Sequence, residues 1–302
     1  MAIQKEIWKD YIVENLFQDN PHLNLAVVAD DMVDGKTVHI PNAGSVASVS
    51  RNRSSFPASA SQRTDNDASY DIDEFSMDPV YVQNAEETEA SYDKMASLLV
   101  DVMQTLRDQV GNWAFYNWRA TSGDYITRTT GASVTAHCAS ATGTRKKLLA
   151  ADLATAARIL DVAKAPGADR YCAIDPYMYE QLLQDLRFGE FRDSVKEADL
   201  ARGIIGNLFG FQILKRHTVL RYTNAGTPVP VAPDTSGATT HNGSALCWQR
   251  TMVERALGDI LVFESLGDPL YYGDIVSGLV RAGGRKRRYD GVGVVAIVQA
   301  AV

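Results

Sequence analysis

Histidine and cysteine are the side chains of this sequence with the greatest capacity for metal binding or nucleophilic chemistry. None of them has the spacing of a metal-ligand motif, and neighbours such as His137 and Cys138 point to opposite sides of an extended chain. We therefore expect solvated or capped core histidines, no metal site and no disulfide framework. So few scattered cysteines favour a reducing cytoplasm. The residues concerned are His22, His39, His137, His217, His241, Cys138, Cys172 and Cys247.

Two further patterns match binding motifs only in part. The glycines between positions 203 and 210 lack the lysine of a phosphate-binding loop, and they are expected to turn a loop into a strand. Asp71 and Asp73 lack the glycine and the later glutamate of a calcium loop, and strand alternation places both on one solvent face. No Gly-x-Ser-x-Gly or His-Glu-x-x-His motif occurs. We therefore predict no catalytic residue, no cofactor and no enzymatic activity.

One cluster of like charge is a candidate contact surface, the run Arg285, Lys286, Arg287 and Arg288. Flanking glycines and apolar runs predict that it forms an exposed hairpin turn. Three interpretations stay open: a solvated turn, a contact with acidic side chains of a neighbouring subunit, or a nucleic-acid contact. On the second interpretation, changing Arg287 and Arg288 to Glu should impair assembly. The acidic candidates for that contact are Glu86, Glu87, Glu89, Asp71 and Asp73.

Bulk properties limit the possible classes of protein. With 302 residues, 45% of them hydrophobic, the chain can bury a sizeable core in one or two domains. A formal charge of -7 and a pI near 5.3 argue against a broad nucleic-acid-binding face. The charged N-terminus does not resemble a signal peptide, and no stretch has the length of a membrane span.

Residues 36–118 are the most informative part of the chain. Alternating runs at 37–40 and 70–73 predict two strands of a long hairpin, with a polar tip between them that carries Arg51 and Arg53. A disordered linker is the alternative. Because this segment has too few apolar side chains for its own core, it stays ordered only against another surface. The segment is therefore interpreted as an arm that lies against neighbouring subunits.

A long helix follows the arm. Its apolar residues recur every three or four positions from Met95 to Trp113, which predicts a helix over residues 85–117, about 50 Å long. Ahead of the arm, residues 1–34 are expected to form a short helix or an extended strap, whose apolar side includes Trp8 and Phe17. Further helices are predicted at 148–164, 176–186 and 251–257, and strands at 171–174, 211–214, 245–248 and in the last forty residues. Residues 122–144 are expected to be a loop.

This order of elements resembles the major capsid protein of tailed bacteriophages, an α+β protein with the Hong-Kong-97-like fold. The similar segments are LLVDV at 98–102, YCAIDP at 171–176 and GNLFGFQIL at 206–214. The resemblance covers essentially the whole chain. It implies an N-terminal arm (1–34), an extended loop (35–83), a spine helix of a peripheral domain (84–121), a mainly axial domain (122–257) and C-terminal strands that return to the peripheral domain (258–302).

The resemblance also implies a function without catalysis. Copies of the chain would form hexamers and pentamers and close into an icosahedral shell around double-stranded DNA, without sequence-specific binding and without a membrane. A separate scaffolding protein and a portal are implied partners, and synthesis in the host cytoplasm precedes the virion. Some relatives crosslink through a lysine–asparagine isopeptide bond. The extended loop here has only Lys36 at its base and arginines at its tip, so non-covalent assembly is expected.

Two alternatives stay open. Encapsulins, bacterial compartments that resemble the same fold, would package a cargo enzyme instead of a genome. An unrelated cytoplasmic enzyme would need a pocket with convergent polar groups, and the sequence supplies no sign of one.

Overall fold

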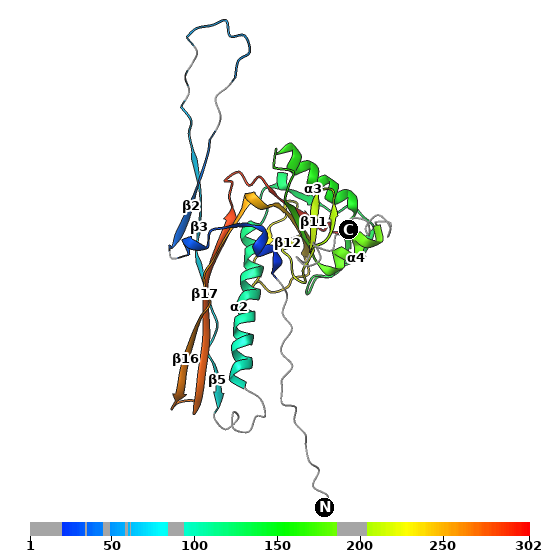
Figure 1. Cartoon of the computed structure of the whole chain (residues 1–302). Coiled ribbons are helices and arrows are strands. Elements are labelled where there is room, and N and C mark those ends of the chain that lie inside the picture. Colours follow the sequence, from blue (N-terminus) through cyan, green and yellow to red (C-terminus); the bar gives the residue numbers. More distant parts are fainter. Residues whose placement is uncertain are drawn as a thin grey trace, which may run out of the picture.

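The protein is elongated, with an arm at one end and a layered body beside a long helix (Figure 1). The structure is a computed structural model of the chain, and it describes residues 20–33, 35–44, 49–57, 60, 62–83, 94–185 and 204–302. The hairpin of β2 and β3 projects in one direction, and the strands β5, β16 and β17 extend in the opposite direction alongside α2. The helices α3 and α4 lie on the side of the body remote from the arm.

The helices within the described residues are α2 (Lys94–Trp118), α3 (Ala150–Val162) and α4 (Pro176–Asp185), with short 3-10 turns η1 (Pro21–Leu25), η2 (Asp30–Met32), η3 (Gly123–Tyr125) and η4 (Arg250–Met252). The strands are β1 (Val27–Val28), β2 (Thr37–Asn42), β3 (Asn66–Asp71), β4 (Asp73–Ser76), β5 (Val80–Gln83), β6 (Ile126–Arg128), β7 (Ser133–Thr135), β8 (Thr144–Lys146), β9 (Arg170–Ile174), β10 (Ile204–Leu208), β11 (Phe211–Lys215), β12 (Arg221–Thr223), β13 (Pro230–Val231), β14 (His241–Gln249), β15 (Val253–Leu257), β16 (Leu261–Asp268), β17 (Gly273–Lys286) and β18 (Val294–Val298).

The long helix α2 packs against β17, the central strand of a six-stranded sheet. The sheet has the order β1-β15-β17-β16, and β4 and β5 also pair with β17. Val102, Leu106 and Val110 recur every four residues and bury one stripe of the helix against Val280 of the strand. Gly278 permits this approach, because a Cβ atom there would lie 2.7 Å from a methyl of Val102.

An eight-stranded sheet forms the second part of the body. Its main order is β10-β11-β9-β14-β12-β13, and β18 joins β14 to β6. Asp175 begins α4, since its carboxylate accepts a hydrogen bond from the Met178 amide at 2.7 Å. The helices α3 and α4 cover one face of the sheet with Leu153, Leu160 and Leu182. Because successive side chains of a strand point to opposite faces, the remaining residues of these strands point to the other face of the sheet.

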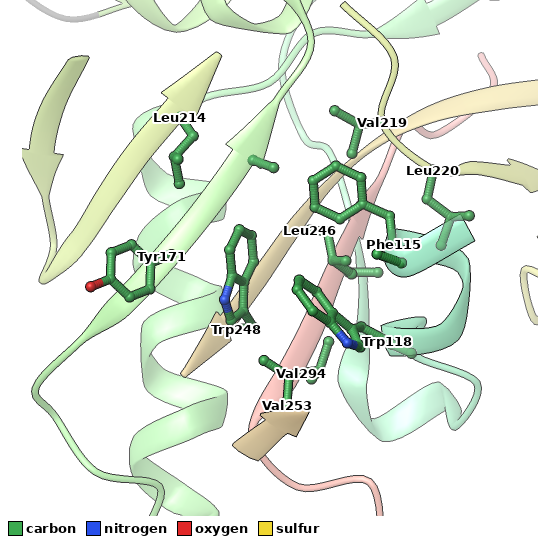
Figure 2. Packing of buried hydrophobic residues seen from close by; sticks show 14 of the residues in the cluster. Phe115, Trp118, Tyr171, Leu214, Val219, Leu220, Leu246, Trp248, Val253 and Val294 are labelled. Atoms are coloured by element: carbon green, nitrogen blue, oxygen red, sulfur yellow. The ribbon is translucent and has the colours of Figure 1, made fainter. Parts of the chain in front are cut away.

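That other face is joined to the end of α2 by a cluster of aromatic rings (Figure 2). Trp248 of β14 lies between Tyr171 of β9 and Trp118 of α2, with ring centroids 5.9 and 5.8 Å away. Phe115 completes the cluster, at 6.0 Å from Trp248. Both tryptophans are fully buried. The cluster therefore sets how the long helix meets the eight-stranded sheet.

The N-terminal described segment is held in the same region by a buried histidine. His22 of η1 stacks on Phe115, with centroids 4.0 Å apart, and its Nε2 donates a hydrogen bond to the Gly111 carbonyl at 3.1 Å. Burial, and then the nearby Arg216 guanidinium, hold the pKa of His22 well below its ordinary value of 6.5. His22 is thus one of the capped core histidines expected from the sequence.

We predict that His22 makes the protein less stable in mild acid. The unfolded chain takes up a proton near pH 6.5 and the folded chain does not, so the free energy of unfolding falls as the pH drops below 6.5. The limiting slope is about 1.4 kcal/mol per pH unit. His22→Gln should remove this component, and urea unfolding of both proteins between pH 7 and 5 measures it. Parallel profiles for the two proteins would show that His22 takes up its proton in the folded state.

The structure confirms the predicted α3, β9, α4, β11 and β14 to within a few residues, and α2 over its described part. Residues 251–257 are a correction, because 253–257 form β15 and the two residues before them belong to the 3-10 turn η4, where a short helix was expected. β15 pairs with β17 on one edge and with β1 on the other. Hydrogen bonding along both edges outweighs the helix propensity of this segment.

Three segments that were expected to be loops or turns contain strands. Residues 204–208 are β10, which pairs with β11 across a tight turn at Phe209 and Gly210, both with positive φ. Within 122–144, η3, β6 and β7 are present. Gly283 and Gly284 lie inside β17, which continues to Lys286. Gly283 is needed there because a Cβ atom would come within 3.0 Å of the Asp71 carbonyl.

Candidate functional site

The base of the arm is anchored on its own chain. The arm is defined here as residues 37–71, and its strands β2 and β3 pair antiparallel from Thr37 opposite Asp71 to Asn42 opposite Asn66, which confirms the predicted hairpin. Alternate side chains such as Ile40 and Tyr70 are buried with Ala256 of β15. The expectation that the arm rests only on other copies is therefore wrong for its base.

The tip of the arm has no such core within its described residues. The arm tip is defined as residues 43–65, and two large apolar side chains on it, Val49 and Phe56, are 96% and 78% exposed. Arg51 and Arg53, candidate contacts from the sequence, are also exposed there. Figure 1 shows the tip standing clear of the body. Exposed apolar and cationic side chains on an extended loop are available for another surface.

A second exposed apolar group lies at the opposite end of the molecule, where β16 turns into β17. Leu270 and Tyr272 are 82% and 80% exposed, and Phe263 on β16 is half exposed. Tyr271 packs on Tyr81 of β5, with centroids 5.3 Å apart. Sequence reasoning missed this group, although the run Leu-Tyr-Tyr directly before a glycine is an unusual composition for a solvated turn.

Two cations of the basic run, Arg287 and Arg288, each form an ion pair with a different carboxylate of the same subunit. Arg287 Nε lies 3.1 Å from the Glu254 carboxylate of β15, and Arg288 is bonded to Asp290 within the turn. Both cations are therefore neutralised within the subunit. Changing Arg287 to Glu would place a carboxylate beside Glu254, which is only 8% exposed in its side chain. That variant would disturb the fold itself, so it is a poor test of assembly.

Arg285 and Lys286 lie in a different environment, a recess at the foot of the arm that we call the basic notch. Its volume is about 370 Å³, and its walls come from the arm, the end of α2 and β17. From Gly283 to Lys286, β17 pairs with β15 on one edge. Among the described strand pairs, none occupies its other edge over these residues. The lining residues are Tyr70, Asn117, Arg119, Thr121, Gly284, Arg285 and Lys286.

Lys286 is the most perturbed cation of the notch. Burial, and then repulsion by Arg119 and Arg285, lower the pKa of its ammonium group to about 8. The Arg285 guanidinium donates to the Ser69 carbonyl of the arm, and the Arg119 guanidinium donates to the Tyr116 carbonyl at 2.8 Å. Among the described residues, no carboxylate lies within ion-pair distance of these three cations.

A second cavity of about 370 Å³ lies beside the eight-stranded sheet and holds the residues closest to catalytic chemistry. His137 Nε2 is 2.7 Å from the Asp175 carboxylate, and the ring stacks on Tyr177. Burial and the charge of Asp175 raise the pKa of the adjacent Cys138 thiol to about 11. A thiol in that state is a poor nucleophile at neutral pH, so Cys138 does not supply an activated nucleophile to the pair of His137 and Asp175.

The remaining sequence candidates are placed as follows. Asp71 and Asp73 are both exposed on either side of the buried Ile72, as the alternation predicted, and Thr37 donates to Asp71 at 2.7 Å. Burial and the neighbouring Asp71 raise the pKa of Asp73. Within the described part of the chain, no group of three potential metal ligands comes together. Glu86, Glu87, Glu89, Trp8 and Phe17 lie outside the described residues.

Arg119 is the notch residue that sequence reasoning missed. It is a single arginine just after the end of α2, and nothing in its local sequence distinguishes it from a solvated cation. Only the fold brings it to Lys286, which is more than 160 residues later in the chain.

Comparison with solved structures identifies the architecture. Over 98% of this chain and 97% of the other, it is similar to a structure of Mycobacterium phage Che8, with a TM-score of 0.66 and 18% identity. The capsid structure of cyanophage P-SCSP1u matches over 97% and 92%, with a TM-score of 0.66 and 19% identity. The capsid of Ralstonia phage GP4 matches over 99% and 95%, with a TM-score of 0.67 and 13% identity. No family model and no curated protein sequence matches the chain.

The fold predicted from the sequence is thereby confirmed. The chain has the α+β, Hong-Kong-97-like fold of these phage capsid structures, and the likeness extends over nearly the full length of both chains. The identities are all below 20%, so what is shared is the arrangement of the elements.

Proposed function

We propose that this chain is the major capsid protein of a tailed bacteriophage. The observation that carries the proposal is the full-length likeness to phage capsid structures. An arm anchored at its base and bare at its tip supports it, because such a tip has its apolar contacts on another molecule. The role is geometric: identical copies bury complementary surfaces and close into a shell.

The finer organisation follows from the same proposal. Residues 35–83 would be the extended loop, 84–121 the spine region of a peripheral domain, 122–257 mainly an axial domain, and 258–302 the return to the peripheral domain, after an N-terminal arm of residues 1–34. Hexamers and pentamers would enclose double-stranded DNA non-covalently, with a separate scaffolding protein and a portal as partners. The protein would be made in the host cytoplasm and reside in the virion. It would have no catalytic role.

Absence of a membrane-spanning role is also part of the proposal. None of the helices in the described part of the chain combines the length and the apolar character needed to cross a bilayer.

Electron microscopy of the purified chain, expressed alone and with a candidate scaffolding protein, tests the proposal. We expect closed shells or ring-shaped capsomers, and particles from infected cells should contain double-stranded DNA. Shells that contain a cargo enzyme would instead support the encapsulin alternative. A small discrete oligomer under all conditions would contradict a shell-forming role. It would favour the enzyme alternative, with the cavity of His137 and Asp175 as the candidate site. Ladders of crosslinked chains on a denaturing gel would contradict non-covalent assembly.

A further inference from the structure

We propose that the basic notch is a receptor for a carboxylate side chain of a second copy of this chain, and that Lys286 is the group that binds it. The inference rests on the function proposed above, since it names a contact through which copies associate.

The notch collects three cations from two separate parts of the fold. Arg285 and Lys286 end β17, and Arg119 follows α2. The two guanidinium groups each donate to a backbone carbonyl, which fixes them beside the recess and leaves further N–H donors free to bind. Within the described residues, the Lys286 ammonium has neither a hydrogen-bond acceptor nor an ion-pair partner. The ammonium lies beside Gly291 of the adjoining turn, where an added Cβ would be 3.3 Å from Nζ, and its three N–H donors have no acceptor among the described residues.

Acidic groups of the same subunit do not fill this role in the described structure. Glu254 on the adjoining strand is bound by Arg287 and by the Tyr70 hydroxyl at 3.2 Å, and Asp290 in the adjoining turn is bound by Arg288. Asn117 and Thr121, which also line the notch, are uncharged. The cations therefore repel one another in the isolated subunit, and the pKa of Lys286 near 8 reflects burial first and that repulsion second. An oxyanion in the recess would relieve both effects.

The shape and charge of the protein favour a protein carboxylate as the occupant. The notch is a recess of about 370 Å³ under the arm, which is large enough for a carboxylate side chain. The chain has 37 acidic residues against 30 basic ones, so each copy presents surplus carboxylates to its neighbours. The same net charge of -7 repels a nucleic-acid backbone. A second copy is therefore the partner whose charge complements the notch.

This contact should depend on pH in a defined direction. Carboxylate binding requires the charged form of Lys286, which predominates below about pH 8 in the isolated subunit. Above that pH, binding must be accompanied by uptake of a proton, so the association weakens as the pH rises from 7 to 9. Arginine does not lose its charge in this range, so Lys286→Arg should assemble without that dependence.

The first experiment examines the notch in unassembled protein. Lys286 should react with an amine-acylating ester faster than ordinary lysines at pH 8, because more of it is uncharged. Acetate should slow this reaction at Lys286, whereas the exposed Lys215 serves as an internal control. Protection by inorganic phosphate but not by acetate would overturn a carboxylate as the ligand. An equal rate at both lysines, with no effect of acetate, would overturn the receptor altogether.

The second experiment identifies the source of the carboxylate. We compare wild type, Lys286→Met and Lys286→Arg by the protein concentration at which shells form. Lys286→Met should raise that concentration by about tenfold or more at pH 7 and abolish its rise between pH 7 and 9. It should also raise the unfolding temperature of the unassembled subunit, because an uncompensated, partly buried charge is removed. If Lys286 had only a structural role, its replacement would not weaken shell formation and at the same time raise the unfolding temperature of the subunit.

The outcomes keep the two proposals distinct. Shells that form equally well from Lys286→Met and wild type at pH 7 would overturn the notch as a contact between copies, while the capsid function would stand. A wild-type chain that forms no shells would contradict the capsid function, and with it the second copy as the partner. The acetate experiment would then still decide whether the notch binds carboxylates.

Discussion

Replacing residues 43–65 with Asn-Gly is expected to yield a folded subunit that forms no shells. Asn42 and Asn66 are directly opposite each other at the end of the hairpin, so a two-residue turn can join them without changing the register. The core at the base of the arm, which includes Ile40 and Tyr70, is retained. The unfolding temperature should therefore stay within a few degrees of wild type, while sedimentation and electron microscopy should show only subunits or small rings.

A matched variant shows whether the apolar side chains of the tip are responsible. Val49→Ser with Phe56→Ser keeps the full length of the tip and removes two large apolar groups that are exposed in its described part. Each such group contributes roughly 1.5–3 kcal/mol when it is fully buried at a contact. We expect assembly that requires a much higher protein concentration. Normal shells from the Asn-Gly variant would contradict the role of the tip.

Trp248→Ala is expected to have the largest effect on stability, a loss of about 3–5 kcal/mol in the free energy of unfolding. The side chain is fully buried among Tyr171, Trp118 and Phe115, and its Nε1 donates to the Leu25 carbonyl at 3.0 Å. Its removal leaves a cavity where α2 joins the eight-stranded sheet. Urea unfolding of the unassembled subunit, followed by circular dichroism, measures the loss.

Two control variants divide the expected loss into its parts. Trp248→Phe keeps most of the ring volume and loses the hydrogen bond to Leu25, so we expect a loss of about 1 kcal/mol beyond the change in packing. Trp113→Ala removes the same residue type from a partly exposed position on the same helix as Trp118, and its effect should be clearly smaller. Equal effects at Trp113 and Trp248 would show that the aromatic cluster is not the joint between the two parts of the body.

Local signals in the sequence were sufficient for several elements. The apolar repeat of α2 identified the helix, because a stripe such as Val102, Leu106 and Val110 is buried along one face. The capping residue Asp175 and the proline after it placed the start of α4. Alternation around Ile40 located the arm. In each case the burial pattern follows from neighbours a few residues away.

Contacts between distant segments account for the rest. Residues 253–257 have helix-forming side chains and become β15 because strands from both ends of the chain pair with them. Gly283 and Gly284 have the composition of a turn, yet they are glycines because the arm and β15 approach β17 too closely for a side chain. No local pattern contains that information.

In the basic notch, too, local sequence indicates part of the site and contacts between distant segments determine the rest. The sequence marks residues 285–288 as a basic run, but the four cations are chemically different in the folded protein. Arg287 and Arg288 have carboxylate partners, whereas Lys286 has two arginines as its charged neighbours among the described residues. The partner Glu254 is more than thirty residues from Arg287, so spacing alone could not separate the paired cations from the unpaired ones.

Hydrogen–deuterium exchange of the arm tip before and after assembly measures whether the tip finds its packing partners only on another copy. Backbone amides of residues 49–57 should exchange at nearly unprotected rates in the unassembled subunit and be slowed by on the order of a hundredfold in shells. Amides of β9 and β14 should be protected in both states. Equal exchange of the tip in the two states, whether fast or slow, would show that the tip does not gain its packing partners on assembly.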